Sequence, residues 1–240
     1  GDCKGSGLAM LNGIKEICEI IPASLCLHDK LRRTNLHFDE ERSDYDAIAQ
    51  RLSQHDRVLC IVNTRKDAQE IYSRLPDEGI TLHLSRMMCP KHLSETIALI
   101  KKLLKDGNKK VIRVIATQLI EAGVDIDFPV VFRQEAGLDS ILQAAGRCNR
   151  EGKMAMGATY VFKLHRSLPS GYISNSVDAQ TTLLRTQPNA DWFAPETMRN
   201  FFVQLYSRTQ NFDKADIGIL LYKPRELCFK TAASNFHLIE

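Results

Sequence analysis

The sequence predicts an α/β fold in three layers, a mainly parallel β-sheet with helices on both faces. Short apolar runs alternate with longer segments of helical periodicity along most of residues 1–165. The apolar runs are nearly continuous, as in the VLCIV run at residues 58–62, instead of alternating with polar residues. Continuous runs are typical of parallel strands that helices cover on both sides.

The strands and helices of this domain follow from that alternation. Strands are expected at residues 31–38, 57–63, 80–84, 111–116, 129–132 and 158–164, and helices at residues 8–21, 44–52, 66–75, 90–104 and 139–148. The helix at 66–75 has apolar residues at positions 68, 71, 72 and 75, which is helical spacing. The helix at 90–104 begins with a proline and is followed by Gly107, and both are common boundary residues.

Beyond residue 165 the pattern is looser. A stretch rich in Ser, Gly and Asn precedes expected helices near 177–186 and 195–207 and a weak strand near 226–230. We therefore predict one α/β domain over residues 1–165 and a partly helical extension over residues 166–240. The aromatic residues of MRNFFVQLY, at 198–206, could stack on nucleic-acid bases, but such a stripe is more often core or a docking face.

Composition excludes several classes of protein. The chain has 240 residues, of which 44% are hydrophobic and 25% charged, and this is globular usage. No apolar run approaches the roughly 18 residues of a membrane span. The formal net charge of +3 is too small to argue for nucleic acid by itself. The first residues resemble neither a signal peptide nor a natural start, so we expect a piece of a longer, cytoplasmic protein.

The cysteines and histidines do not predict a metal site. The chain has 7 cysteines, and none forms a CxxC pair or a Cys/His cluster with zinc spacing. Cys60 lies inside an apolar run, which predicts a buried thiol in a reducing compartment.

Polar residues collect where three of the expected strands end. Asn63 and Thr64 follow the first central strand, Arg86 follows the next, and Thr117 ends the third. The carboxyl ends of parallel strands are where ligands bind in open α/β sheets, and helix starts there favour phosphate oxygens. Each residue by itself is more often a helix cap, but three similar sites on one edge favour a surface for a polyanion.

The QAAGRCNREG segment, residues 143–152, carries the strongest cluster. On a helix, Gln143, Arg147 and Arg150 are spaced i, i+4, i+7, so we expect them to share one face, with both guanidinium groups projecting from a common surface. Two such planar forks suit a phosphate with several charged oxygens. The alternative is a solvated helix face with salt bridges.

A second segment, VIRVIATQLIEAGVDID at residues 111–127, leads from a strand to Gly123 and Asp125. Gly123 permits a backbone conformation that other residues rarely adopt. A carboxylate just beyond it can accept hydrogen bonds from a ribose, as in other nucleotide-binding folds, although Gly-Val-Asp is also an ordinary turn.

Taken together, NTR (63–65), ATQLIEAGVDIDF (116–128) and QAAGRCNREG (143–152) resemble motifs IV, V and VI of superfamily 2 helicases. These motifs belong to the second of two RecA-like domains. The amino-acid sequences of residues 116–128 and 136–152 closely resemble the CRISPR-associated helicase–nuclease of type I systems. The resemblance covers about residues 15–165 and extends loosely beyond them.

The resemblance implies a role for each residue. Arg147 and Arg150 would reach the γ-phosphate of ATP, which the first RecA-like domain holds with Mg²⁺, and Gln143 would bond near the phosphates or the attacking water. Gly123 and Asp125 would lie at the ribose. Single-stranded DNA would contact four residues through its phosphates, namely Asn63, Thr64, Arg86 and Thr117. The whole protein would be a DNA translocase and nuclease of antiviral defence, recruited by an RNA-guided surveillance complex.

These 240 residues lack a GxxxxGK[ST] phosphate loop, a DExH-like box and a His/Asp cluster suited to a nuclease. We therefore expect half of an ATPase site and half of a DNA track, with no ATP or Mg²⁺ held by this part alone and little or no turnover. Two alternatives remain open. The chain could be the second lobe of another superfamily 2 enzyme, such as an RNA helicase or restriction-type motor, or a non-catalytic nucleic-acid-binding module.

Overall fold

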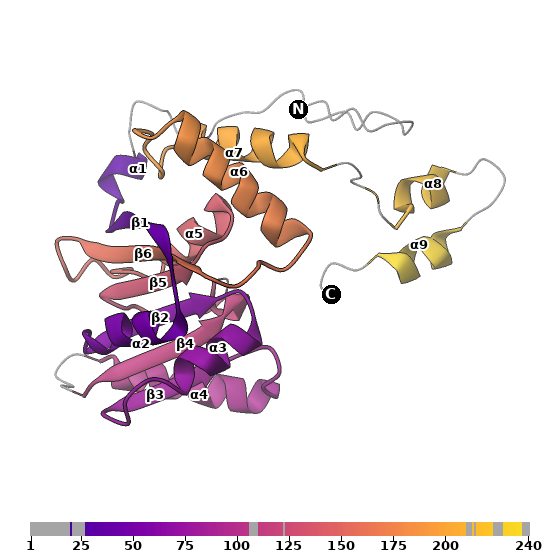
Figure 1. Cartoon of the computed structure of the whole chain (residues 1–240). Helices are drawn as coiled ribbons and strands as arrows, with labels where there is room; N and C mark the ends of the chain where they lie inside the picture. Colours follow the sequence, from indigo (N-terminus) through magenta and orange to yellow (C-terminus); the bar gives the residue numbers. More distant parts are fainter. Residues whose placement is uncertain are drawn as a thin grey trace. The chain divides into compact units, whose positions relative to one another are not determined.

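The computed structural model describes residues 20, 27–105, 110–121, 123–209, 213, 215–222 and 228–236, except the side chain of residue 28. Among them, six strands form one sheet in the order β1-β6-β5-β2-β4-β3, and every neighbouring pair is parallel (Figure 1). The strands are β1 (Thr34–Ser43), β2 (Arg57–Val62), β3 (Ile80–Leu84), β4 (Ile112–Thr117), β5 (Val130–Gln134) and β6 (Gly157–Leu164). This confirms the predicted α/β fold with a parallel sheet.

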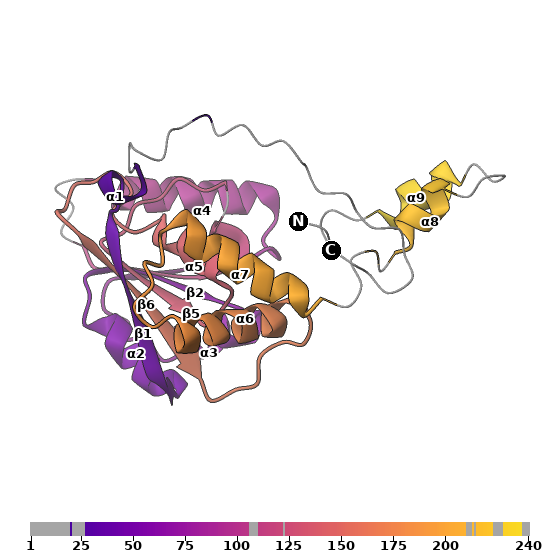
Figure 2. The same ribbon diagram turned by 90° about the horizontal axis from the view of Figure 1, so that it is seen from above.

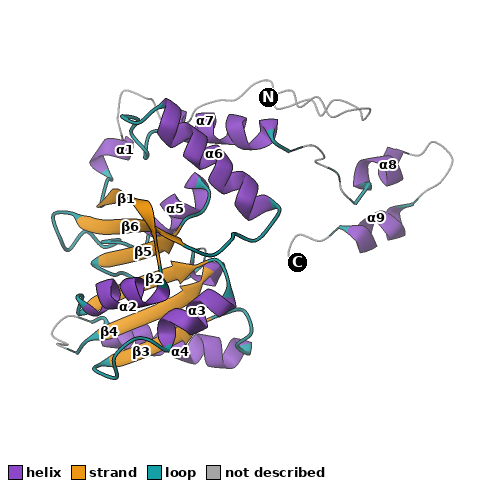
Figure 3. Ribbon diagram, in the orientation of Figure 1, coloured by secondary structure: helices purple, strands orange, loops and turns teal. Residues whose placement is uncertain are grey.

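Helices alternate with these strands and continue beyond them (Figure 3). They are α1 (Leu27–Lys30), α2 (Tyr45–Ser53), α3 (Arg65–Tyr72), α4 (Pro90–Leu103), a short 3₁₀ helix η2 (Gln118–Ile120), α5 (Leu138–Ala145), α6 (Tyr172–Thr186), α7 (Pro195–Ser207), α8 (Ile217–Tyr222) and α9 (Phe229–Asn235). One compact unit spans residues 23–205, whereas α8 and α9 belong to a second unit and contact each other.

Two hydrophobic cores lie on opposite faces of the sheet, because successive side chains of a strand alternate between its faces. On one face α2 and α3 pack against β2, and the buried side chains include Ile48, Leu52 and Ile71. On the other, α4 and α5 cover residues of β2 and β4, such as Leu59 and Val114 (Figure 2). Fully burying one such aliphatic side chain stabilises the fold by about 1.5–3 kcal/mol.

Helix α6 and residues 195–205 of α7 pack on α5 within the compact unit of residues 23–205. Leu138 of α5, Leu183 of α6, and Phe201 and Leu205 of α7 form a third buried cluster. Of the two interpretations of the aromatic stripe at 198–206, the core interpretation is therefore right for Phe201 and Leu205. The predicted division of the chain at residue 165 stays a prediction.

Several expected elements differ from the structure, and one of them is α6, which begins at Tyr172 instead of near residue 177. The helix predicted over 139–148 ends at Ala145, because the chain there leaves the helix to pair Cys148 with Phe128 in an isolated parallel bridge. The weak strand predicted near 226–230 is wrong at Phe229 and Lys230, which begin α9. Strand β1 begins at residue 34, later than predicted, and runs to residue 43 because it pairs with β6 along that length. The helix predicted at 8–21 lies outside the described residues, apart from residue 20.

The cysteines give a direct test of this packing. Cys60 and Cys148 are buried, and burial raises the pKa of both thiols, whereas Cys89 is exposed. Because the thiolate is the reactive form, we expect iodoacetamide to label Cys89 at least about tenfold faster than Cys60 or Cys148 in the folded chain. Peptide mass spectrometry after timed labelling measures this. Equal labelling rates in the folded chain, matching those in urea, would contradict the buried positions.

Candidate nucleotide and nucleic-acid sites

The carboxyl ends of β2, β3 and β4 bring together the residues predicted to contact DNA. Thr117 is the last residue of β4, Asn63 and Thr64 follow β2, and Arg86 lies just after β3. Because these strands are hydrogen-bonded neighbours and parallel, their carboxyl ends lie along one edge of the sheet. Arg86 is exposed, while Asn63, Thr64 and Thr117 are half-buried.

Asn63 is held by residues at the end of β5. Its backbone N–H donates to Oε1 of Gln134 at 2.8 Å, and its Nδ2 donates to the carbonyl oxygen of Glu135 at 2.9 Å. Its Oδ1 accepts a hydrogen bond of 2.8 Å from Nη1 of Arg133. The amide is therefore fixed by the fold, and its position depends on the neighbouring strand.

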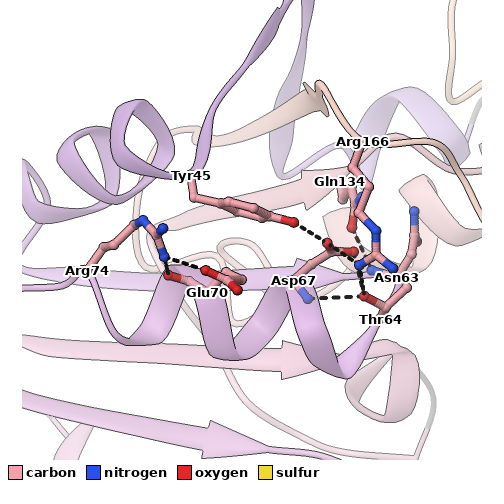
Figure 4. Close-up of polar contacts among 8 residues, drawn as sticks. All are labelled: Tyr45, Asn63, Thr64, Asp67, Glu70, Arg74, Gln134 and Arg166. Atoms are coloured by element: carbon pink, nitrogen blue, oxygen red, sulfur yellow. Dashed lines mark hydrogen bonds and ion pairs between the residues drawn. The ribbon is translucent and has the colours of Figure 1, made fainter.

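Thr64 caps the N-terminus of α3, as the simpler interpretation predicts. Its Oγ1 accepts a hydrogen bond of 3.1 Å from the backbone N–H of Asp67 and donates to the Asp67 carboxylate at 2.6 Å (Figure 4). The carboxylate is buried, and it also accepts from Tyr45 Oη at 2.8 Å and from Arg166 Nη1 at 3.1 Å. Burial, and then this carboxylate, raise the pKa of Tyr45.

Arg166 adds a cation to this edge that the sequence analysis missed. Its Nη1 lies 3.3 Å from Oγ1 of Thr64, and its side chain is 41% exposed, so the guanidinium is accessible to a phosphate. The hydrogen bond and charge of Asp67 raise the pKa of Arg166. Arg166 lies just beyond the end of β6. The rule that finds polar residues at strand ends would have found it, had it been applied to this strand.

The second predicted site forms where residues 116–128 meet residues 143–152. Gly123 is exposed and has φ +74°, a left-handed conformation that glycine adopts without strain. Asp127 accepts hydrogen bonds from the backbone N–H groups of Arg150, at 2.7 Å, and Glu151, at 3.4 Å. The Asp125 carboxylate accepts a hydrogen bond of 2.8 Å from Nη2 of Arg150. Two segments far apart in the sequence are thus joined around one arginine.

Arg147 and Arg150 do not lie on a common helix face, because α5 ends at Ala145. The prediction that both guanidinium groups project from one surface is also wrong. The Arg147 side chain turns inward and is 7% exposed, with Nε donating to Ile120 O at 3.0 Å and Nη2 to Glu121 O at 2.7 Å. The Arg150 side chain is 44% exposed and pairs with Asp125. Burial, and then the nearby Arg150 cation, lower the pKa of Arg147.

The turn that carries these arginines lies at the amino edge of the sheet. Phe128, just before β5, donates to the carbonyl oxygen of Arg147 at 3.0 Å, and its own carbonyl accepts from the backbone N–H of Asn149 at 2.8 Å. Asn149 Nδ2 also donates to the carbonyl of Arg33, just before β1. The arginine turn and the polar strand ends are therefore at opposite edges of the sheet. Gln143 is exposed on α5.

Mg²⁺ finds no group of ligands in the described part of the chain. No set of three or more His, Cys, Asp or Glu residues there could hold a metal ion. Asp125 and Asp127, the acidic residues of the second site, are already bound by Arg150 and by backbone N–H groups. Among the described helices, none is both long and apolar enough to cross a membrane.

A parallel sheet of this order, with helices on both faces, is an α/β domain of the RecA-like class. Residues 54–153 match the family model described as "CRISPR-associated nuclease/helicase Cas3, C-terminal". The chain is 32% identical to Cas3 of Methanothermobacter thermautotrophicus over 115 residues, which are 47% of this chain and 14% of that protein. It is 29% identical to Cas3 of Streptococcus thermophilus over 135 residues, or 52% of this chain and 14% of that protein.

Solved structures agree with the sequence match at the level of the fold. A crystal structure of T. fusca Cas3 with ADP superposes with a TM-score of 0.56 at 18% identity, covering 74% of this chain and 24% of that one. The resemblance is confirmed over residues 54–153, which are similar in sequence to the C-terminal helicase part of Cas3. The chain spans only a small part, 14%, of the relative from M. thermautotrophicus.

Proposed function

We propose that this chain is the second lobe of an ATP-dependent single-stranded DNA translocase of CRISPR antiviral defence. In this proposal the turn at residues 147–150 faces a nucleotide held by a first RecA-like lobe, and the carboxyl edge of the sheet contacts DNA phosphates. The relatives described as nuclease/helicase Cas3 support an enzymatic parent. The partners proposed are the parent's first RecA-like and nuclease domains, single-stranded DNA and an RNA-guided surveillance complex.

The observation that carries the proposal is the junction of residues 116–128 with residues 143–152. An exposed arginine beside an exposed carboxylate, next to a left-handed glycine, provides a fork for phosphate oxygens and an acceptor for ribose hydroxyl groups. Charge supplied by an arginine stabilises the transition state of phosphoryl transfer. In this arrangement the exposed Arg150 side chain can bind a phosphate at the surface of the domain. Arg147, in contrast, must first break its hydrogen bonds to two carbonyl oxygens.

The DNA part of the proposal predicts binding that depends on salt and not on base sequence. The proposed contacts, from arginines and from polar residues at the strand ends, go to DNA phosphates. An arginine that neutralises a phosphate releases a counterion from the DNA, so binding weakens as the salt concentration rises. We expect the 240-residue chain to bind fluorescein-labelled oligothymidylate in an anisotropy titration, with log Kd varying linearly with log salt concentration.

Arg86→Ala should reduce the slope of that dependence by about 0.7, the value for one phosphate contact to a single strand. Arg185→Ala, which removes an exposed arginine from α6, is the matched control and should leave the slope unchanged. If the oligonucleotide binds wild type and Arg86→Ala with equal affinity at all salt concentrations, Arg86 does not contact the DNA.

A further inference from the structure

A buried series of polar contacts connects the arginine turn at the amino edge of the sheet to the polar residues at its carboxyl edge. It begins at Arg147, whose Nη2 donates to the carbonyl oxygen of Glu121 at 2.7 Å. The carboxylate of Glu121 lies 2.8 Å from Nε of Arg133 as an ion pair, although the N–H does not point at the oxygen well enough for a hydrogen bond. Nη1 of Arg133 then donates to Oδ1 of Asn63 at 2.8 Å.

The Glu121–Arg133 ion pair, in the middle of these contacts, is buried more completely than stability alone would favour. The side chain of Arg133 is 0% exposed and that of Glu121 is 7% exposed. Moving two charges out of water is costly, and well-packed apolar residues of similar size often stabilise a fold equally well. Burial raises the pKa of Glu121, and the positive charge of Arg133 opposes that rise. A fully buried arginine next to the last residue of an interior strand therefore calls for a role besides packing.

A bound ligand would change the surroundings of Arg147 and Asn63, the residues at the two ends of this series of polar contacts. A phosphate with charged oxygens is a stronger acceptor for Arg147 than the carbonyl oxygens of Ile120 and Glu121. If Arg147 moves to a phosphate, the backbone at Glu121 loses its buried partner. The carboxylate of Glu121 is attached to that backbone, and Arg133 connects it to Asn63.

We propose that the Glu121–Arg133 ion pair is a positioning device that couples Arg147 at the nucleotide side to Asn63 at the DNA side. The inference rests on the proposed function of both sites. Neither residue of the pair contacts a ligand. Both act by fixing the amide of Asn63 according to where Arg147 is bound. Because coupling of two binding sites is reciprocal, DNA at Asn63 changes the state of Arg147 to the same extent.

The test uses the 240-residue chain and the NMR signal of the Arg147 Nε–H group, first without any ligand. In the wild-type background, Asn63→Ala is expected to shift this signal at least about threefold more than in an Arg133→Met background. Arg113→Met is the matched control. It removes another buried arginine, which donates instead to Glu78 O and Ser53 O, and the response to Asn63→Ala should persist.

Arg133→Met leaves Glu121 without its partner, so the fold of this variant could be lost. The paired variant Glu121→Leu with Arg133→Met removes both charges and is expected to fold, since replacing both partners is tolerated far better than removing one. It should uncouple Arg147 from Asn63 as well. An Arg147 response to Asn63→Ala that is equally large in the paired variant overturns the proposal.

A second arm adds oligothymidylate to the same samples. We expect DNA to shift the Asn63 Nδ2 signals in both wild type and the paired variant, but the Arg147 signal only in wild type. If DNA shifts no signal at the carboxyl edge, the proposed DNA site fails, while the ligand-free arm still decides the coupling. If DNA shifts Arg147 equally in both proteins, the coupling does not pass through Glu121 and Arg133, and the inference is wrong.

Discussion

Arg150→Ala is expected to reduce ATP turnover by about 10³–10⁵-fold in a protein that joins this chain to a lobe with a phosphate-binding loop. The reason is geometric. Arg150 is the exposed arginine of the 147–150 turn, and its guanidinium pairs with Asp125. In the proposed complex it would exchange that carboxylate for the γ-phosphate, where its charge stabilises the transition state. Steady-state phosphate release measures the change.

Three controls sharpen this experiment. The 240-residue chain alone is expected to show no turnover, because it lacks a phosphate-binding loop. Arg150→Lys keeps the charge but loses the planar fork, so it should restore only part of the rate. Arg185→Ala in α6 should have no effect. DNA affinity should change little in Arg150→Ala, and an equal loss of DNA affinity and turnover would assign Arg150 to the DNA track.

Glu121→Ala is expected to destabilise the chain by about 3–5 kcal/mol, because it leaves the Arg133 charge buried without its partner. The paired variant Glu121→Leu with Arg133→Met should be close to wild type, since no buried charge remains. Urea unfolding followed by the fluorescence of Trp192 measures the free energy of unfolding. This is the chain's one tryptophan, and it packs against the α5–α6–α7 cluster.

The surface pair provides the comparison. Arg150 and Asp125 are also an ion pair, with N and O atoms 2.8 Å apart, but their side chains are 44% and 72% exposed. Solvent screens such a pair, so Asp125→Ala should cost less than about 1 kcal/mol. If Glu121→Ala lowers the free energy of unfolding no more than Asp125→Ala does, the buried pair does not stabilise the fold as its burial implies. The same result would argue against the coupling of Arg147 to Asn63 through this pair.

Much of the fold could be predicted because it depends on local pattern. The continuous apolar run at residues 58–62 predicts a strand covered on both faces, and β2 lies in the interior of the sheet. The Pro90 start of α4 and the cap at Thr64 likewise follow from residue chemistry, since proline and threonine favour these positions whatever surrounds them.

The sequence names residues for the two candidate sites, but it could not predict how these residues are arranged. The motifs identify Arg147, Arg150, Asp125 and Asn63, yet the common helix face expected for the arginines is absent. Helical periodicity could not show that Cys148 would pair with Phe128 and end the helix early. Nor could it show that Arg147 would be held by carbonyl oxygens from a segment more than twenty residues earlier.

By itself, the sequence determined the parallel α/β sheet, the order of its elements and the Cas3-type resemblance, because each depends on residue type and spacing along the chain. Only the tertiary structure decided which arginine is exposed, that Arg166 joins the carboxyl edge, and that Arg133 is buried against Glu121. These outcomes depend on which distant segments meet, and on the cost of leaving a buried charge without a partner.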